Sequence, residues 1–328
     1  MTSLTLTCIG RQQNTHDVVS WQLAPLSGSL PPVLAGQCIT LHTEIDGQPE
    51  CRAYTLSSSP QDACWQVTIK DVGRVSRHLH QTLQVGDKIR VDGPFGDFNL
   101  TALPCERPLL LSAGSGITPM WAMLRDQLAK RPDADIRFIH SARSPADVIF
   151  ADDLAALAKA HAGVRHALIL EEAPADHPWI GRLTPAMLAE LAPDLRERHV
   201  YLCGPAPYMA AVRTMLTELG LPPEQLHQES FGLPPAEPAT TSDHFWLTLK
   251  KSGKKVKILP GQTLLAALEA AGETMMAACR AGVCGSCRCT TTGDIERQSV
   301  MTLSAQDLES GVALACSCTA KGDINLDY

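Results

Sequence analysis

The sequence predicts three domains in succession: an antiparallel β-barrel, a doubly wound α/β domain, and a small mixed domain built around a cysteine loop. Short alternating strands broken by Pro and Gly fill residues 1–103 and predict the barrel. Apolar runs alternating with helical patterns fill residues 104–232 and predict a parallel sheet covered by helices. A Pro-rich linker at 233–242 then separates residues 243–328, which carry the cysteines, as a third domain.

Composition favours a globular protein of several domains. The 328 residues are 45% hydrophobic and 19% charged, and the net charge of −7 argues against general nucleic-acid binding. No run of about 18 apolar residues predicts membrane insertion, and residues 1–7 lack the features of a secretory signal. Twelve cysteines without an export signal, some of them at metal-like spacing, therefore favour a reducing, cytoplasmic location over disulfide pairing.

In the first domain, Leu4, Leu6 and Cys8 alternate with polar residues, and the same period returns at 67–69 and 89–91. Alternation of this kind is typical of half-buried strands. A lone helical pattern at 76–83 interrupts them.

Three short stretches of this domain could bind a phosphorylated ring compound. In Arg52-Ala53-Tyr54-Thr55, the Arg offers paired donors to a phosphate, the Tyr a flat face, and the Thr a hydroxyl for a ring nitrogen. By themselves these residues fit equally well an exposed Arg and an ordinary strand Tyr. Gly73-Arg74-Val75-Ser76 opens the helix, where free N–H groups can bind phosphate. The stretch 93–98, Gly-Pro-Phe-Gly-Asp-Phe, closes the barrel.

The second domain alternates strands and helices. We expect strands at 109–111, 136–140, 167–170 and 200–203, with helices at 121–130, 152–160, 185–191 and 207–219. In such a sheet, ligands bind beyond the carboxyl ends of the strands.

A glycine turn follows the first of these strands, and it reads Gly114-Ser115-Gly116-Ile117-Thr118-Pro119. It is not a dinucleotide fingerprint, because Pro119 replaces the third glycine, and no Gly-Lys-Ser/Thr makes it a P-loop. Glycines two residues to either side of Ser115 are missing, which excludes a hydrolase elbow. A purely structural turn remains an alternative. The turn Cys203-Gly204-Pro205 ends the last strand in the same way, although Cys203 alone could be an ordinary buried residue.

The third domain begins with a hairpin at 245–249 and 256–258, and Thr263 caps a helix that ends before Gly272. A short strand at 322–326 closes the domain. The five lysines between Lys250 and Lys257 are expected to form a solvated rim.

Four cysteines of this domain have the spacing of a plant-type [2Fe–2S] site. Cys279, Cys284 and Cys287 have four and two residues between them, and Cys316 follows 29 positions after Cys287. A zinc site or a redox pair made by Cys284 and Cys287 are the alternatives. Cys289 and Cys318 are second-choice ligands. The small residues between the thiols would let backbone N–H groups face the cluster.

The motifs of the first domain, taken in order, resemble the flavin-binding barrel of the ferredoxin-NADP⁺ reductase superfamily. The resemblance implies that Arg52 binds the flavin phosphate, that Tyr54 lies against the ring, and that Thr55 lies near the reactive N5. Thr55 stands where Ser is commonest, but the hydroxyl is kept. Gly73, Arg74, Val75 and Ser76 would hold the diphosphate at the helix start, and FAD is favoured over FMN.

The second domain resembles the nicotinamide-nucleotide domain of the same superfamily. The turn from Gly114 to Pro119 would hold the pyrophosphate, and Cys203-Gly204-Pro205 would lie beside the nicotinamide, with Thr118 and Cys203 framing the hydride path. Phe231 would cover the flavin, although a core Phe is an equal alternative. Arg143 could bind a 2′-phosphate, but the family favours NADH.

The third domain resembles the β-grasp fold of plant-type ferredoxins. Further stretches at 143–151, 181–184, 203–209, 279–284 and 314–318 resemble the family of NADH oxidoreductases that reduce the hybrid-cluster protein. This resemblance implies an enzyme that passes electrons from NADH through FAD and [2Fe–2S] to an acceptor protein, the hybrid-cluster protein, in nitric oxide or hydroxylamine metabolism. One alternative is the reductase of a multicomponent oxygenase. The other is a non-catalytic relay or redox-sensing subunit, which would not need both nicotinamide turns.

Overall fold

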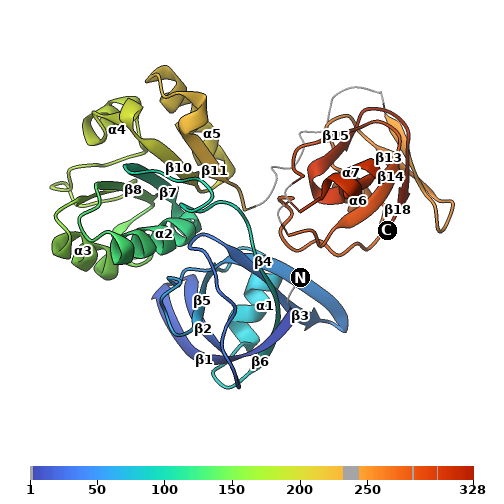
Figure 1. Cartoon of the computed structure of the whole chain (residues 1–328), viewed down its shortest axis with the longest axis horizontal. Coiled ribbons are helices and arrows are strands. Elements are labelled where there is room, and N and C mark those ends of the chain that lie inside the picture. Colours follow the sequence, from blue (N-terminus) through green and yellow to red (C-terminus); the bar gives the residue numbers. More distant parts are fainter. Residues whose placement is uncertain (1–2, 232–243, 283, 301) are drawn as a thin grey trace. The chain divides into compact units, whose positions relative to one another are not determined.

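A computed structural model describes residues 3–231, 244–282, 284–300 and 302–328 (Figure 1). The expected linker at 233–242 lies outside these residues. The chain forms two compact units, Met1–Ile39 with Tyr54–Ser230 and Thr40–Ala53 with Phe231–Tyr328. None of the helices in the described ranges has the length and apolar character needed to cross a bilayer.

The first sheet has six strands in the order β4-β3-β6-β1-β2-β5. Their bounds are β1 Ser3–Thr15, β2 Val18–Pro25, β3 Cys38–Ile45, β4 Gln48–Thr55, β5 Trp65–Lys70 and β6 Lys88–Phe95. The sheet closes on itself where Leu56, directly after β4, bridges to Val67 in β5, and the Ser57 N–H donates to the Gln66 carbonyl at 2.8 Å. The predicted antiparallel barrel is therefore confirmed.

The single helix of this barrel, α1, spans Arg74–Thr82 and begins two residues before the expected start. Gly73 is its N-cap residue. The Ser76 hydroxyl accepts the N–H groups of Val72 and Gly73 at 3.1 and 2.9 Å, which stabilises the turn before the helix.

The second sheet is parallel, with the order β11-β10-β7-β8-β9. Its elements are β7 Pro108–Ala113, α2 Ile117–Lys130, β8 Ile136–Ala142, α3 Ala151–Ala160, β9 Val164–Leu170, α4 Pro185–Leu191, β10 His199–Cys203, α5 Ala206–Glu218 and β11 Leu226–Glu229. The four predicted strands and four predicted helices are present. The edge strand β11 was not predicted, because its four residues show neither an apolar run nor alternation.

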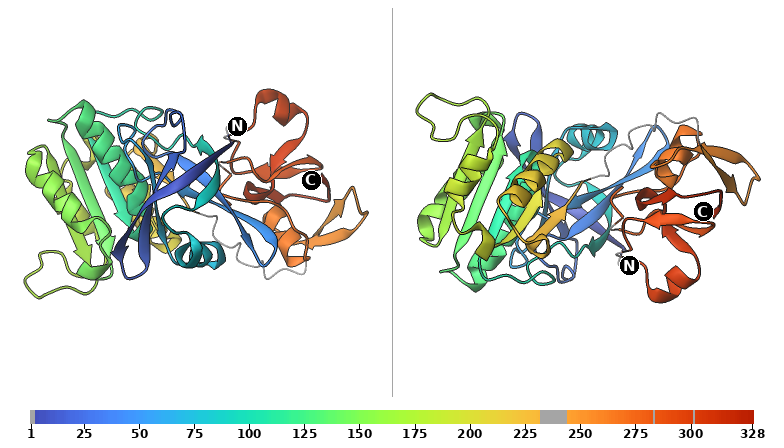
Figure 2. Two further views of the ribbon diagram at one scale, coloured as in Figure 1. Left: turned by 90° about the horizontal axis from the view of Figure 1, so that it is seen from below. Right: turned by 90° about the horizontal axis from the view of Figure 1, so that it is seen from above.

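Alternate residues of β7 show why this domain is doubly wound. Leu110 packs in a buried cluster with Met120 of α2 and Leu154 of α3. Its neighbours Leu109 and Leu111 pack on the other face with residues of α4 and α5. In Figure 1, α4 and α5 lie above the sheet and α2 and α3 below it, and the two views of Figure 2 look onto these layers in turn. Since both faces of the sheet are covered, the apolar strand is fully buried.

The third sheet has the order β13-β12-β18-β14-β16, and β15 pairs with β17 beside it. The elements are β12 Phe245–Leu249, β13 Lys255–Ile258, α6 Leu264–Ala270, β14 Arg288–Thr292, β15 Ile295–Arg297, α7 Ala305–Glu309, β16 Val312–Leu314, β17 Cys318–Ala320 and β18 Ile324–Asp327. The predicted hairpin, helix and last strand are present, and the Thr263 side chain caps α6 by accepting the Ala266 N–H at 3.2 Å. The sequence did not predict the elements from β14 to β17.

Candidate functional site

The two glycine turns of the α/β domain touch each other. A Cβ atom on Gly116 would lie 2.3 Å from the Cys203 carbonyl oxygen, and one on Gly204 would lie 3.2 Å from the Ala113 nitrogen. The contact exists because β7 and β10 are neighbouring parallel strands in which Cys203 pairs with Ser112. Motifs far apart in the sequence therefore form one backbone cradle at the carboxyl edge of the sheet.

The first turn offers mainly backbone groups to a ligand. Gly114–Gly116 form a short 3₁₀ turn that leads into α2. The side chains of Ile117, Thr118 and Pro119 are buried, and the Thr118 hydroxyl donates to the Ser115 carbonyl at 3.0 Å. Because the first N–H groups of a helix have no partner inside it, this turn suits an anionic ligand such as a diphosphate.

A cavity of about 450 Å³ opens beside this cradle, within the usual range for small-molecule sites. Three of the residues predicted for the nicotinamide site, Gly114, Arg143 and Pro205, line it. Lys70 from β5 of the barrel also lines the wall, so the cavity lies where the barrel and the α/β domain meet. Lys70 and the other residues of the wall belong to the same compact unit.

Arg143 does not face this cavity as a free cation. Its guanidinium donates to Asp147 at 2.6 and 3.2 Å, and this hydrogen bonding lowers the pKa of the Asp147 carboxyl to about 2. Glu171, a second carboxylate in the wall, accepts from Arg182 at 3.3 Å. The Arg143 guanidinium is therefore already paired with a carboxylate of its own loop, which leaves it less available to an additional phosphate group on the coenzyme.

Behind the cradle lies a buried row of polar side chains that the sequence did not reveal. Ser112 pairs across the sheet with both Cys203 and His140, and its hydroxyl lies 2.9 Å from the His140 Nδ1. Burial lowers the pKa of His140 to about 4, so the imidazole is neutral. Burial, followed by the nearby Glu229, raises the pKa of the Cys203 thiol well above its usual value. The sequence did not single out His140, because this residue lies within an apolar strand.

In the barrel, the four predicted flavin residues lie at the end of β4. The Arg52 guanidinium donates to its neighbour's carbonyl, that of Cys51, at 2.7 Å and lies 3.4 Å from Glu50. Arg52, Ala53 and Tyr54 are half-buried, whereas Thr55 is buried. The side chain of Arg52 is therefore partly exposed and is already engaged within its own strand.

At the start of α1, Arg74 is exposed, but Val75 and Ser76 are buried. The Ser76 hydroxyl is used inside the turn, where it also donates to the Gly73 carbonyl at 3.0 Å. A Cβ on Gly73 would meet no atom within 4 Å, so the backbone of this turn lies open. What Gly73 to Ser76 can offer a diphosphate is thus backbone N–H groups and the Arg74 side chain.

Phe231 is 47% exposed. This excludes the alternative that it is a core residue. It leaves the ring accessible for contact with a ligand or another surface.

The four predicted cluster cysteines come together in the third domain, and each is at most 9% exposed. The thiol of Cys316 faces those of Cys279 and Cys287, and Cys279 also faces Cys284. Within the described residues, no three His, Cys, Asp or Glu side chains are arranged around a single metal ion. A [2Fe–2S] cluster distributes its four thiolates over two irons. The second-choice ligands Cys289 and Cys318 lie in the apolar core of the domain.

Backbone N–H groups point at these sulfurs. The Gly282 N–H lies 3.2 Å from the Cys316 Sγ, and the Ala281 N–H lies 3.4 Å from the Cys279 Sγ. Gly282 has a φ of +74°, and a Cβ there would lie 2.6 Å from Ser299. Such N–H groups stabilise negative charge on sulfur, so the loop is suited to an anionic iron–sulfur cluster.

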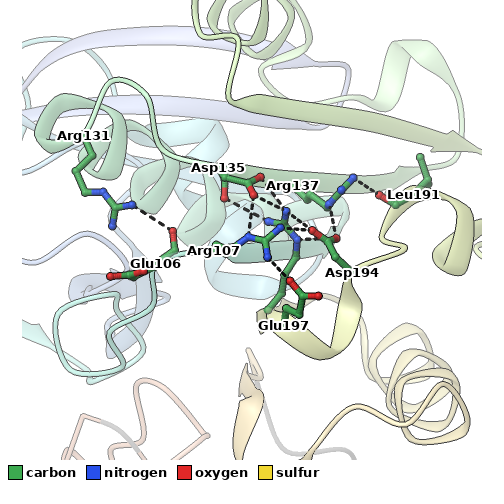
Figure 3. A network of polar contacts seen from close by, with 9 residues as sticks. Glu106, Arg107, Arg131, Asp135, Arg137, Leu191, Asp194 and Glu197 are labelled. Carbon is green, nitrogen blue, oxygen red and sulfur yellow. Dashed lines mark hydrogen bonds and ion pairs between the residues drawn. The ribbon is translucent and has the colours of Figure 1, made fainter.

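A further charged cluster lies at the opposite edge of the parallel sheet. Arg198, which is fully buried, donates to Asp135 and Asp194 at 2.8 and 2.7 Å. Arg107 donates to Asp135 at 2.9 Å (Figure 3). The hydrogen bond from Arg198 is the main cause that lowers the pKa of Asp194. Asp135 and Arg198 directly precede β8 and β10, at the amino ends of the strands. This network therefore holds the strands together and takes no part in the cavity.

The chain matches three domain families in sequence order. The oxidoreductase FAD-binding domain matches residues 12–100, the oxidoreductase NAD-binding domain matches 110–214, and the 2Fe-2S iron-sulfur cluster binding domain matches 247–321.

Two relatives match this chain over most of their own length. The glycine betaine monooxygenase reductase subunit of Chromohalobacter salexigens is 36% identical over 305 residues, covering 86% of this chain and 83% of the relative. The NADH oxidoreductase HCR of Escherichia coli K12 is 35% identical over 303 residues, covering 91% and 89%. The solved structure of phthalate dioxygenase reductase is similar to this chain with a TM-score of 0.64 at 25% identity, over 99% of this chain and 98% of that one.

Proposed function

This chain belongs to the family of reductases that join FAD-binding, NAD-binding and [2Fe–2S] cluster-binding domains in one polypeptide, and we propose which of its residues carry the electron transfer. Membership confirms the expected cofactors and the expected class of enzyme, an NADH-dependent flavoprotein oxidoreductase. A flavin exchanges electrons in pairs with a nicotinamide and singly with an iron–sulfur cluster, so the proposed order is NADH, FAD, [2Fe–2S] and then an acceptor protein.

The observation that carries this function is the contact between the turn at Gly116 and the turn at Cys203 and Gly204. A ligand whose diphosphate lies on the first turn would extend directly over the second. The side chains of Cys203 and His140 are fully buried behind the two turns. The raised pKa of the thiol and the lowered pKa of the imidazole keep both groups neutral, so neither places a charge beneath the ligand. A non-catalytic relay would have no use for this cradle.

On the flavin side, we assign Arg52 and Arg74 to the phosphates, Tyr54 to one face of the ring, and the Thr55 hydroxyl to N5. Phe231 is assigned to the other face of the ring, which its exposure permits. On the coenzyme side, the Arg143–Asp147 pair in the cavity wall supports NADH over NADPH. For the cluster, Cys279, Cys284, Cys287 and Cys316 are the proposed ligands, supported by their mutual contacts and by the N–H groups that face them.

Anaerobic stopped-flow mixing of the holoenzyme with NADH tests the order. Flavin absorbance should bleach before the absorbance of the cluster. A flavin-free preparation whose cluster is reduced by NADH at the same rate would refute this order.

Two acceptors are supported by relatives of similar closeness. A terminal oxygenase component is supported by the C. salexigens relative at 36% identity, and the hybrid-cluster protein by the E. coli relative at 35%. Each purified acceptor should be titrated under NADH turnover with this reductase. The physiological partner should saturate at low concentration and outpace an artificial dye acceptor, whereas the wrong partner should show a linear, unsaturated dependence.

A further inference from the structure

Two pairs of side chains join a loop of the barrel to helix α2 of the α/β domain. The loop between β4 and β5 carries Asp62, whose carboxylate accepts both arms of the Arg125 guanidinium at 2.7 and 2.8 Å. Gln61, the residue before Asp62, donates to Asp126, the residue after Arg125, at 2.9 Å. We call these four residues, Gln61, Asp62, Arg125 and Asp126, the clasp. All four belong to one compact unit.

Each half of the clasp is itself held in place. The Ser59 N–H donates to Asp62 at 2.9 Å, which fixes the carboxylate relative to its own loop. Arg125 lies over the Trp121 ring at 5.8 Å, and that ring stacks on Phe150 at 5.2 Å. Asp126 is only 4% exposed and also accepts from Lys130 at 2.7 Å. Each half of the clasp therefore has a supporting contact within its own domain.

Apolar side chains also join the barrel to this helix. Ala35 and Phe98 of the first domain pack in one buried cluster with Met120 and Met123 of α2. Apolar contact is non-directional, so it holds two surfaces together without fixing how they are rotated or shifted. A bidentate Arg–carboxylate pair has a defined geometry, so the clasp supplies the register that the apolar cluster lacks.

The position of the clasp links the two sites of the reaction. Its loop follows directly after Thr55 at the end of β4, and α2 follows directly after the glycine turn at Gly114–Gly116. A shift of α2 against the loop would therefore move the coenzyme cradle relative to the residue assigned to flavin N5. We propose that Asp62 and Arg125 are positioning residues that set the distance between nicotinamide and flavin for hydride transfer. This inference rests on the proposed function.

The side chains of Asp62 and Arg125 are 30% and 32% exposed, so the pair contributes modestly to stability. Loss of the Asp62–Arg125 pair should instead change the relative position of the bound coenzyme and the flavin. Small displacements of reacting groups can slow a reaction up to about 100-fold, so we expect a loss of about tenfold or more in the limiting rate of flavin reduction by NADH. The dissociation constant of NADH should change by less than about twofold, because neither residue lines the cavity.

The test uses two conservative variants of the holoenzyme in anaerobic stopped-flow. Asp62→Asn keeps an acceptor for the Ser59 N–H but loses the charge, and Arg125→Lys keeps the charge but loses the fork. The double variant should be no slower than the slower single variant, because the two substitutions remove the same interaction. Arg90→Gln is the matched control. The ion pair between Arg90 and Asp92, at 3.7 Å, lies within the barrel. Replacement of Arg90 should therefore leave the rate of flavin reduction unchanged.

A second readout does not depend on turnover. The charge-transfer absorbance of the NADH–flavin complex reports how the rings stack, and it should weaken in both clasp variants but not in Arg90→Gln. Unchanged rates with unchanged charge-transfer absorbance would overturn the inference. So would a change confined to NADH affinity, or a fall in thermal midpoint without any change in the rate. A wild-type flavin that NADH does not reduce would instead overturn the proposed function itself.

Discussion

His140 should make the α/β domain acid-sensitive in a predictable way. Its side chain is fully buried, and burial lowers its pKa from 6.5 to about 4. Between these two values the unfolded chain binds a proton that the folded chain does not. The contribution of His140 to the free energy of unfolding is therefore fully present above pH 6.5 and is lost as the pH falls toward 4.

The size of the effect follows from the shift. A difference of about 2.5 pKa units corresponds to about 3 kcal/mol of unfolding free energy, of which about 2 kcal/mol should be lost by pH 5. The assay compares the wild type with His140→Gln, using the opening free energy of the β8 amides from hydrogen exchange at pH 7 and pH 5. Exchange at β8 isolates this domain in a chain of several domains.

The variant is expected to be less stable at pH 7 but to lose about 2 kcal/mol less than the wild type on going to pH 5. Burial also lowers the pKa values of His166 and His227, but these titrate in both proteins and cancel in the comparison. Equal losses in the two proteins would refute the reasoning. It would then follow that His140 is hydrated or protonated in the folded state.

Three further outcomes are expected. Gly116→Ala should weaken NAD⁺ binding by about tenfold or more, equivalent to about 1.4 kcal/mol, because its Cβ would lie 2.3 Å from the Cys203 carbonyl oxygen; equilibrium titration of NAD⁺ measures this. Asp147→Asn should raise kcat/KM with NADPH relative to NADH by about tenfold, since removal of the carboxylate frees Arg143 for a 2′-phosphate; an unchanged ratio would contradict this role. Cys316→Ser should abolish the cluster absorbance yet leave flavin reduction by NADH within about twofold, whereas Cys318→Ser serves as its control and should keep the cluster.

The motifs could be predicted from the sequence because each is a local backbone device. Gly114 to Pro119 and Cys203 to Pro205 each follow a buried strand, and parallel strands end at a common edge. Their contact therefore follows from topology once the strands are recognised. The cysteine spacing is similarly local, and it predicted four thiols that the structure brings together.

What could not be predicted depends on partners distant in sequence. The strand β11 has no apolar pattern, because an edge strand is defined by pairing with β10 rather than by burial of its own residues. The pair Asp62–Arg125 spans 63 positions, and its two residues look like ordinary surface charges. Asp147 is a different case, because it lies only four residues from Arg143; the sequence did not show that the two side chains pair, and it left Arg143 open to a 2′-phosphate.

In the cluster loop, Arg280 and Gly282 both have positive φ angles but have different structural roles. Arg280 has a left-handed φ of +53°, which costs an ordinary residue roughly 1 kcal/mol, whereas Gly282 adopts φ +74° without that cost. Glycine is required at 282, because Ser299 and Ser317 leave no room for a Cβ. Position 280 keeps a side chain despite the strain, because its guanidinium donates to Glu269 of α6 at 3.0 Å. The loop is thus free to bring its N–H groups to the sulfurs at one position and is anchored to the helix at another.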